Sequence, residues 1–304
     1  MKSDKFSLLA FFKRYPNEEA AVEYFEKLRW GDGVRCPHCG SVHVSKCKHP
    51  MPYRCKECRK HFSVRVGTIL EDSKLPLQKW LLAIYILTNA KKGISSIQLA
   101  EYLECTQKTA WFLAHRIREA WQEQLDKFSG IVEVDETYIG GTEKNKHRNK
   151  KQNAGRGAVG KTPVVGVRSR EGKVKAGAVA SVDCKTLSAI VYNNVTEGAT
   201  LCTDNFSGYN TITGYNHYRV NHSAGEYVRD NMHTNGIEGF WSILKRGLLG
   251  VYHKWSVKHL NRYVGEFVIR YNSRENAATD RIQSVILGGI GRHLSYKELI
   301  YGTP

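Results

Sequence analysis

Four cysteines in two closely spaced pairs constrain the fold of this chain more than any other feature. Cys36 and Cys39 form one CxxC pair, Cys55 and Cys58 form another, and fifteen residues separate the pairs. Two thiolates that flank a tight turn can bind one ion, and two such turns complete a tetrahedral Zn²⁺ site. A redox role is the alternative, but a thioredoxin-type motif needs a single CxxC in a βαβ context. The spacing therefore predicts a structural zinc site.

The residues that follow the two pairs differ in their backbone freedom. Gly40 follows the first pair and gives that turn access to left-handed conformations. Arg59 stands at the equivalent place after the second pair, so we expect less freedom there. The other four cysteines are scattered along the chain, which favours a reducing cytosol over a framework of disulfides.

Basic residues outnumber acidic residues. The 304 residues include 46 Lys and Arg against 29 Asp and Glu, a formal net charge of +17 at pH 7. Such an excess attracts polyanions, so nucleic acid is the leading partner and a merely cationic surface is the alternative. The longest apolar run, Trp80 to Leu87, is far shorter than the roughly 20 residues that span a bilayer. With no secretory signal either, we expect no membrane partner and a cytoplasmic protein, associated with the nucleoid when bound to DNA.

Changes of pattern divide the chain into four expected segments. Residues 1–33 form an N-terminal helical segment, in which Asn17 precedes an expected helix. Residues 34–66 contain the paired cysteines, residues 67–127 repeat apolar residues at helical spacing, and residues 128–304 begin with β-rich runs. A chain of this length accommodates about two or three domains.

Residues 67–127 show the pattern of a helix-turn-helix. Apolar residues recur at helical spacing from Leu77 and again from Ser95, and Thr106 is the expected N-cap of a third helix. Helix pairs of this kind read DNA in some proteins and are purely structural in others. As a DNA reader, the third helix would present to the major groove and the DNA backbone the side chains of Gln107, Lys108, Thr109 and Arg116.

Carboxylates occur inside an apolar strand pattern after Gly130. Alternation along residues 131–139 predicts that Glu133 and Asp135 face one side and that Glu136 faces away from them. Buried carboxylates without partners are costly, and a metal ion is a common remedy, while a solvated strand face is the alternative. A later strand, residues 200–203, ends at Asp204.

The segments between and after these strands complete a mixed α/β pattern. Residues 162–180 predict a hairpin, and residues 185–194 predict a short helix. The later part of residues 231–246 is a further expected helix, and Glu238 and Lys245, seven positions apart, share one of its faces.

This order of elements and acidic residues resembles the DDE insertion-sequence transposases that carry an N-terminal zinc ribbon, the ISXO2-like group. The resemblance covers nearly the whole chain, and its most specific segments are CPHCG with CKEC, VDETYIGG, TDNFSGY and HTNGIEGFWSILKRG. It implies an α/β fold in which a ribonuclease H-like catalytic domain follows a zinc ribbon and a helix-turn-helix. It also implies a triad of Asp135, Asp204 and Glu238, with Lys245 as the basic residue near the DNA.

The resemblance implies a DNA transposase that binds element ends, cleaves DNA and joins the 3′ ends to target DNA. Two Mg²⁺ or Mn²⁺ ions on the triad would support this phosphodiester transfer. Glu238 is preferred over Asn235 as third ligand, because a charged oxygen binds Mg²⁺ more strongly than an amide. The implied partner is double-stranded DNA, bound by a homodimer or a higher assembly. A catalytically inactive DNA-binding regulator is the alternative.

A basic loop with no helical or strand period lies between residues 144 and 161. Neutralisation of phosphates would order such a loop, whereas a simply solvated loop is the alternative. Its candidate DNA-binding residues are Lys146, Arg148, Lys150, Lys151 and Arg156.

Overall fold

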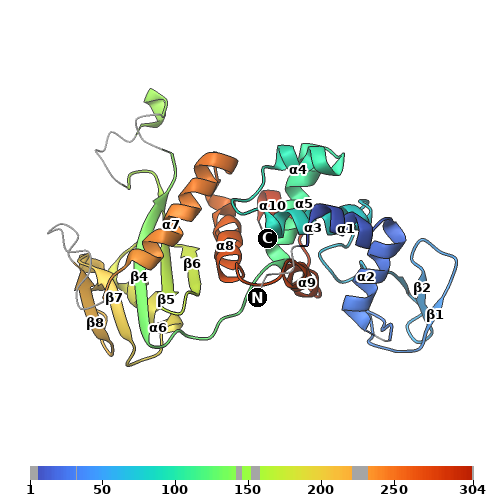
Figure 1. Cartoon of the computed structure of the whole chain (residues 1–304), viewed down its shortest axis with the longest axis horizontal. Helices are drawn as coiled ribbons and strands as arrows, with labels where there is room; N and C mark the ends of the chain where they lie inside the picture. Colours follow the sequence, from blue (N-terminus) through green and yellow to red (C-terminus); the bar gives the residue numbers. More distant parts are fainter. Residues whose placement is uncertain (1–5, 32, 142–145, 152–157, 221–231, 303–304) are drawn as a thin grey trace. The chain divides into compact units, whose positions relative to one another are not determined.

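The computed structural model describes residues 6–31, 33–141, 146–151, 158–220 and 232–302. These residues form two compact units: the first contains Met1–Gln122 and Glu275–Pro304, and the second contains Glu123–Arg274 (Figure 1). None of the described helices is both long and apolar enough to cross a membrane.

The first unit contains seven helices among the described residues and a small three-stranded sheet. Its antiparallel strands have the order β1-β2-β3; Cys36 and Cys39 precede β1, Cys55 ends β2, and Cys58 lies between β2 and β3. Asn17 caps α2 by accepting a hydrogen bond from the backbone N–H of Ala20, which confirms the helix expected there. The bounds are α1 Leu8–Arg14, α2 Glu18–Trp30, β1 Val44–Lys46, β2 Tyr53–Cys55, β3 His61–Phe62, α3 Leu77–Asn89, α4 Ser96–Leu103, α5 Gln107–Ala120, α9 Ala278–Gly288 and α10 Tyr296–Tyr301.

Helices α4 and α5 form the expected pair with a tight turn. Thr106 caps α5, because its hydroxyl accepts a hydrogen bond from the backbone N–H of Thr109. Glu104 takes a left-handed conformation with φ of 49° and ends α4. The helix pair is therefore present, and its role in reading DNA stays a prediction.

The last thirty residues belong to the first unit, whereas we expected them in the catalytic segment 128–304. Helix α9 packs against α2, α3 and α5, and it buries Ile282, Val285 and Ile286. Arg281 also donates from Nη2 to Oδ1 of Asn89 on α3, over 2.6 Å. The apolar face of α9 is buried against the first unit, and this places residues 275–304 there. The sequence does not show which part of the chain an apolar helix face packs against.

The second unit is built on a five-stranded sheet in the order β6-β5-β4-β7-β8. Strands β4, β5 and β6 pair antiparallel, whereas β4, β7 and β8 pair parallel. This mixed α/β architecture confirms the expected class. The bounds are β4 Ile131–Ile139, η2 Arg148–Lys150, β5 Thr162–Ser169, β6 Val174–Ala178, α6 Cys184–Asn194, β7 Thr200–Asp204, η3 Ser207–Tyr209, β8 Asn216–Val220, α7 Asn235–Gly247, η5 Leu248–Tyr252, η6 Val257–His259 and α8 Leu260–Asn272.

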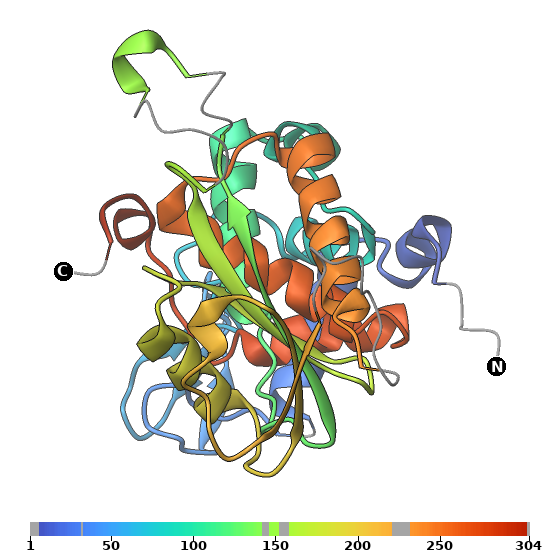
Figure 2. The same ribbon diagram turned by 90° about the vertical axis from the view of Figure 1, so that its left-hand side faces the viewer.

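Helices cover both faces of this sheet (Figure 2). On one face, Val132 and Val134 of β4 pack with Leu187 and Val191 of α6. On the other face, Val164 of β5 packs with the apolar residues of α7 and α8. Strand alternation therefore separates two cores, and α7 shares its face with the odd-numbered carboxylates of β4.

A glycine in β5 allows α7 to approach the sheet closely. Gly166 pairs with Asp135 of β4. A Cβ added at Gly166 would lie 2.6 Å from Cη2 of Trp241 and 2.9 Å from Cδ1 of Ile237. Both of these α7 side chains are buried, so they have little room to move.

We expect Gly166→Ala to destabilise the protein by about 1 to 3 kcal/mol through overpacking. Gly177→Ala in β6 is the matched control, because the nearest atom to its Cβ would be Oδ1 of Asn261, at an ordinary 3.8 Å. Thermal unfolding followed by circular dichroism measures both variants. Equal melting temperatures for the two would contradict the close packing of α7 on β5.

Candidate active site and zinc site

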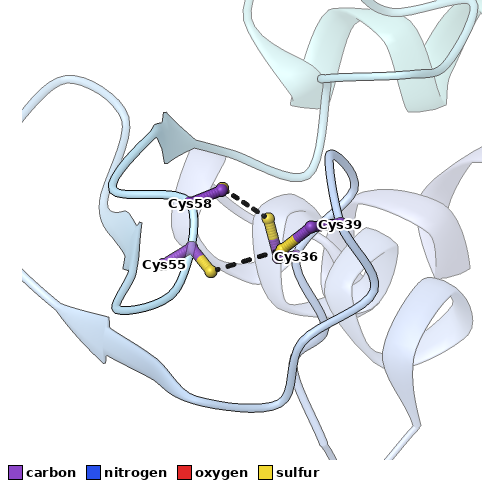
Figure 3. Close-up of side chains that lie close together, drawn as sticks. All are labelled: Cys36, Cys39, Cys55 and Cys58. Carbon is purple, nitrogen blue, oxygen red and sulfur yellow. Dashed lines mark hydrogen bonds between the residues drawn. The ribbon is translucent and has the colours of Figure 1, made fainter.

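The four paired cysteines converge on one point (Figure 3). Their sulfurs all lie within 4.8 Å of one another, and the Sγ–Sγ distance is 3.6 Å both between Cys36 and Cys58 and between Cys39 and Cys55. A tetrahedral Zn²⁺ with Zn–S bonds of about 2.3 Å requires sulfurs about 3.8 Å apart. The predicted cluster is confirmed, and its geometry and soft donors fit zinc.

The two cysteine turns have similar backbones although their sequences differ. Gly40 has a φ of 77° and Arg59 a φ of 60°, so both take a left-handed conformation. This conformation costs about 1 kcal/mol or more for a residue with a Cβ. We expected the side chain of Arg59 to limit the backbone freedom of the second turn, but Arg59 takes the same left-handed conformation as Gly40.

Two aspartates lie at the adjacent parallel strands β4 and β7. The register pairs Glu133 with Cys202, and two residues further along it aligns Asp135 with Asp204, the last residue of β7. Burial, together with the negative charges of Glu136 and Asp204, raises the pKa of Asp135 to about 7. The indole Nε1 of Trp241 donates a hydrogen bond to Oδ2 of Asp135 over 2.9 Å. This hydrogen bond lowers the pKa of Asp135. The structure therefore brings these two predicted site residues together.

Glu136 is a third carboxylate in this neighbourhood, and the sequence predicted only that it faces away from Asp135. Strand alternation does turn it away from Asp135, but its charge still acts on that residue. Burial raises the pKa of Glu136, and the charge of Asp204 contributes. The phenol of Tyr209 donates to Oε2 of Glu136 over 2.7 Å and lowers that pKa. The TDNFSGY segment, which carries both Asp204 and Tyr209, was the available signal.

Glu238 and Lys245 lie on the exposed face of α7, as their spacing predicted. Oε1 of Glu238 accepts a hydrogen bond from the hydroxyl of Thr234 over 2.9 Å. In the described part of the chain, only the four cysteines form a group of three or more His, Cys, Asp or Glu close enough to hold one metal ion. Glu238 is thus not drawn together with the two aspartates. Asn235, the alternative ligand, is the exposed first residue of α7.

Glu133 is fully buried and anchors the start of α7. Its Oε2 accepts from the backbone N–H of Ile237 over 2.8 Å, and its Oε1 accepts from Nη1 of Arg168 over 3.0 Å. Nε of Arg170 and Nδ1 of His233 each lie 3.7 Å from Oε1. Glu133 is therefore compensated by basic partners and is structural.

The other carboxylates lack such compensation. Within the described residues, no basic side chain forms an ion pair with Asp135, Glu136 or Asp204. Like charges gathered in a partly buried place are unfavourable without a counter-charge. Carboxylate oxygens are the donors that Mg²⁺ prefers. Asp135 and Asp204 fit a divalent cation on their charge and donor chemistry, and Glu136 adds negative charge from the other face of β4.

The candidate DNA-reading residues of α5 have partners within the first unit. Nε2 of Gln107 donates to Oγ of Ser96 over 2.7 Å, and Nζ of Lys108 lies 4.7 Å from the ring centroid of Tyr296. Both side chains remain exposed, whereas Thr109 is half-buried and bonded to the hydroxyl of Thr106. Arg116 is only 4% exposed. It is therefore not on the exposed surface of α5, from which we expected it to reach the DNA backbone, and it lines a cavity within the first unit.

The basic loop lies partly outside the described residues, and Arg156 is among those not described. Arg148 and Lys151 are exposed, and Lys146 is half-buried. The backbone of Arg148–Lys150 forms a short 3₁₀ turn, although the residues show no helical period.

Comparisons with known proteins match both halves of the sequence. Residues 16–61 match the transposase zinc-ribbon domain, and residues 127–272 match the ISXO2-like transposase domain. The chain carries a transposase zinc ribbon followed by an ISXO2-like transposase domain. A relative in Halobacterium salinarum, described as an uncharacterized protein in transposable element ISH50, is 25% identical over 90% of this chain and 97% of its own length.

Solved transposase structures show only a distant likeness. The Mos1 transposase paired-end complex with the left transposon end is 12% identical, with a TM-score of 0.28, over 69% of this chain and 78% of that chain. A pre-cleavage Mos1 transpososome is 11% identical, with a TM-score of 0.27, over 95% and 96% of the two chains. TM-scores this low carry no argument about this chain. The resemblance to zinc-ribbon ISXO2-like transposases is confirmed by the two domain matches.

We expect the transposase zinc ribbon to lose its metal when one cysteine is replaced. Cys39→Ser removes a thiolate from the cluster, and the serine hydroxyl is a poor ligand for Zn²⁺. Cys184→Ser, outside the ribbon, is the matched control. Metal analysis of the purified proteins should find zinc in the parent and the control and little in Cys39→Ser. Undiminished zinc in Cys39→Ser would mean that the cluster is not the site.

Proposed function

We propose that this chain is a DNA transposase that binds element ends, cleaves DNA and joins the 3′ ends to target DNA. The observation that carries the proposal is the pair Asp135 and Asp204, aligned on adjacent parallel strands inside the domain that matches ISXO2-like transposases. We propose a ribonuclease H-like fold for this domain. The sheet order, with two antiparallel pairings (β6-β5 and β5-β4) and two parallel pairings (β4-β7 and β7-β8), supports it.

Two Mg²⁺ or Mn²⁺ ions bound here would supply a nucleophile at neutral pH and stabilise the leaving oxygen of an in-line displacement. Asp135 and Asp204 offer charged oxygens, and Trp241 orients Asp135 through its indole N–H. Tyr209 holds Glu136 beside them. We assign Glu238 as the third ligand by its place in the family motif, and Lys245, seven residues along the same exposed face, to contact with DNA.

DNA is the proposed partner on the grounds of charge. The net charge of +17 favours a polyanion, and exposed basic side chains include Lys108 at the start of α5 and Arg148 and Lys151 in the basic loop. We propose that the zinc ribbon and the α4–α5 pair bind element ends, that two or more copies assemble there, and that this takes place in the cytoplasm on the nucleoid.

The direct test is strand transfer by the purified, zinc-loaded full chain. The substrate is a duplex that carries the terminal repeats of the element, with Mg²⁺ and a supercoiled target. Asp135→Asn and Asp204→Asn should each lower cleavage and joining by at least about two orders of magnitude, because each removes a charged ligand. Glu171→Gln, an exposed residue outside the strands, should leave both rates unchanged.

Each alternative predicts a different result in this assay. Activity that survives Asp135→Asn and Asp204→Asn would exclude the proposed site. A parent protein that binds the element ends tightly but never cuts them would instead indicate an inactive DNA-binding regulator.

A further inference from the structure

A cavity of about 440 Å³ lies within the first unit, beside the N-terminal half of α5. Phe112 and Arg116 of α5 line it together with Trp80 of α3, and Asp72 and Lys74 line it from the preceding loop. The cavity therefore combines aromatic walls with charged and hydroxyl-bearing side chains. Its volume exceeds that of one planar aromatic ring system.

Arg116 is the polar group of this cavity that lacks a full set of partners. Its Nη2 donates to the carbonyl oxygen of Glu71, and its Cζ lies 5.4 Å from the ring centroid of Trp80 and 5.3 Å from that of Phe112. Its buried Nε has no hydrogen-bond partner among the described residues. A buried N–H without a partner is unfavourable, so a ligand with a hydrogen-bond acceptor would be stabilised here.

The charges around this cavity are mixed and do not select an anion. Burial lowers the pKa of Arg116 to about 10, the carboxylates of Asp72 and Glu71 act to raise it, and the charge of Arg65 acts to lower it. Asp72 and Lys74, of opposite charge, both line the cavity. A neutral planar ligand with acceptor atoms, which stacks on aromatic or guanidinium planes, fits better.

We propose that this cavity binds an unpaired nucleobase of DNA that is bound to the chain. The proposal rests on the DNA-binding part of the proposed function. A paired base keeps its hydrogen-bonding edge inside the duplex, so the occupant must be a base at an end, in a single strand or turned out of the helix. The cavity lies next to the exposed Gln107 and Lys108, the first residues of the helix expected to meet DNA. Arg116 would then contact a base and not the DNA backbone.

Cys105 provides a direct probe, because this half-buried thiol lines the cavity. The zinc-loaded full chain is alkylated with N-ethylmaleimide, and the labelled peptides are quantified by mass spectrometry. Three DNAs are compared at saturation, as verified by fluorescence anisotropy: a short single strand, the same strand with abasic sites, and the blunt duplex. Cys184 in the second unit serves as the internal control.

We expect the single strand to slow alkylation of Cys105 by about tenfold or more, as base stacking on an aromatic side chain permits. The abasic strand and the blunt duplex should leave the alkylation rate of Cys105 within about twofold of its rate without DNA. The alkylation rate of Cys184 should not change with any of the three DNAs. Phe112→Leu, which removes one aromatic wall, should weaken the protection while binding of the abasic strand stays the same. This variant separates stacking from a general effect of bound DNA.

The outcomes distinguish this inference from the function on which it rests. Binding of the single strand without protection of Cys105 overturns the inference and leaves the proposed function intact. Equal protection by the abasic strand also overturns it, because the backbone would then be the ligand. Failure of all three DNAs to bind would overturn both the inference and the proposed function.

Discussion

The buried carboxylate of Glu133 is the interaction on which the second unit depends. Helix α7 begins at Asn235, and its N-cap residue Thr234 makes no side-chain capping hydrogen bond. Glu133 instead reaches across from β4 and accepts from the N–H of Ile237. The positive end of the helix dipole favours a carboxylate at this place. Because Arg168 compensates the charge, one residue of the sheet fixes both the position and the start of the helix. A Cβ at Gly236 would meet the guanidinium of Arg168 and would lie 2.7 Å from Oε2 of Glu133, so a larger residue there would displace this ion pair.

The site depends on this attachment through Trp241. With α7 held by Glu133, the Trp241 indole lies against Gly166 and donates to Asp135. Two carboxylates two residues apart on one strand thus have different environments. Glu133 has basic partners and is part of the scaffold, whereas Asp135 faces further negative charge and has a raised pKa. The difference in partners, and not in residue type, makes one structural and the other a candidate metal ligand.

Local patterns in the sequence predicted much of this structure. The CxxC spacing located the cysteine cluster, because a metal site within short hairpins is determined by neighbouring residues. Alternation along β4 placed Glu133 and Asp135 on the face opposite Val132 and Val134. The N-cap at Thr106 was also predictable, since capping depends on a few adjacent residues.

The features that the sequence did not predict depend on distant partners. Arg116 lies against Phe112 of its own helix and against Trp80 of α3, and the position of Trp80 cannot be predicted from α5 alone. Glu136 faces away from Asp135 as expected, yet the end of β7 and Tyr209 bring it into the same electrostatic environment. The place of Glu238 relative to the aspartates likewise depends on the packing of α7. The spacing of residues along α7 does not determine the distance from Glu238 to the two aspartates.

Binding of a divalent cation by the carboxylates of the second unit tests the central claim most directly. Electron paramagnetic resonance of Mn²⁺ added to the zinc-loaded full chain counts the bound ions without any need for DNA or turnover. We predict that the parent and Glu171→Gln bind Mn²⁺ alike, and that Asp135→Asn combined with Asp204→Asn abolishes this binding. Unchanged Mn²⁺ binding by the double variant would contradict a metal site at β4 and β7.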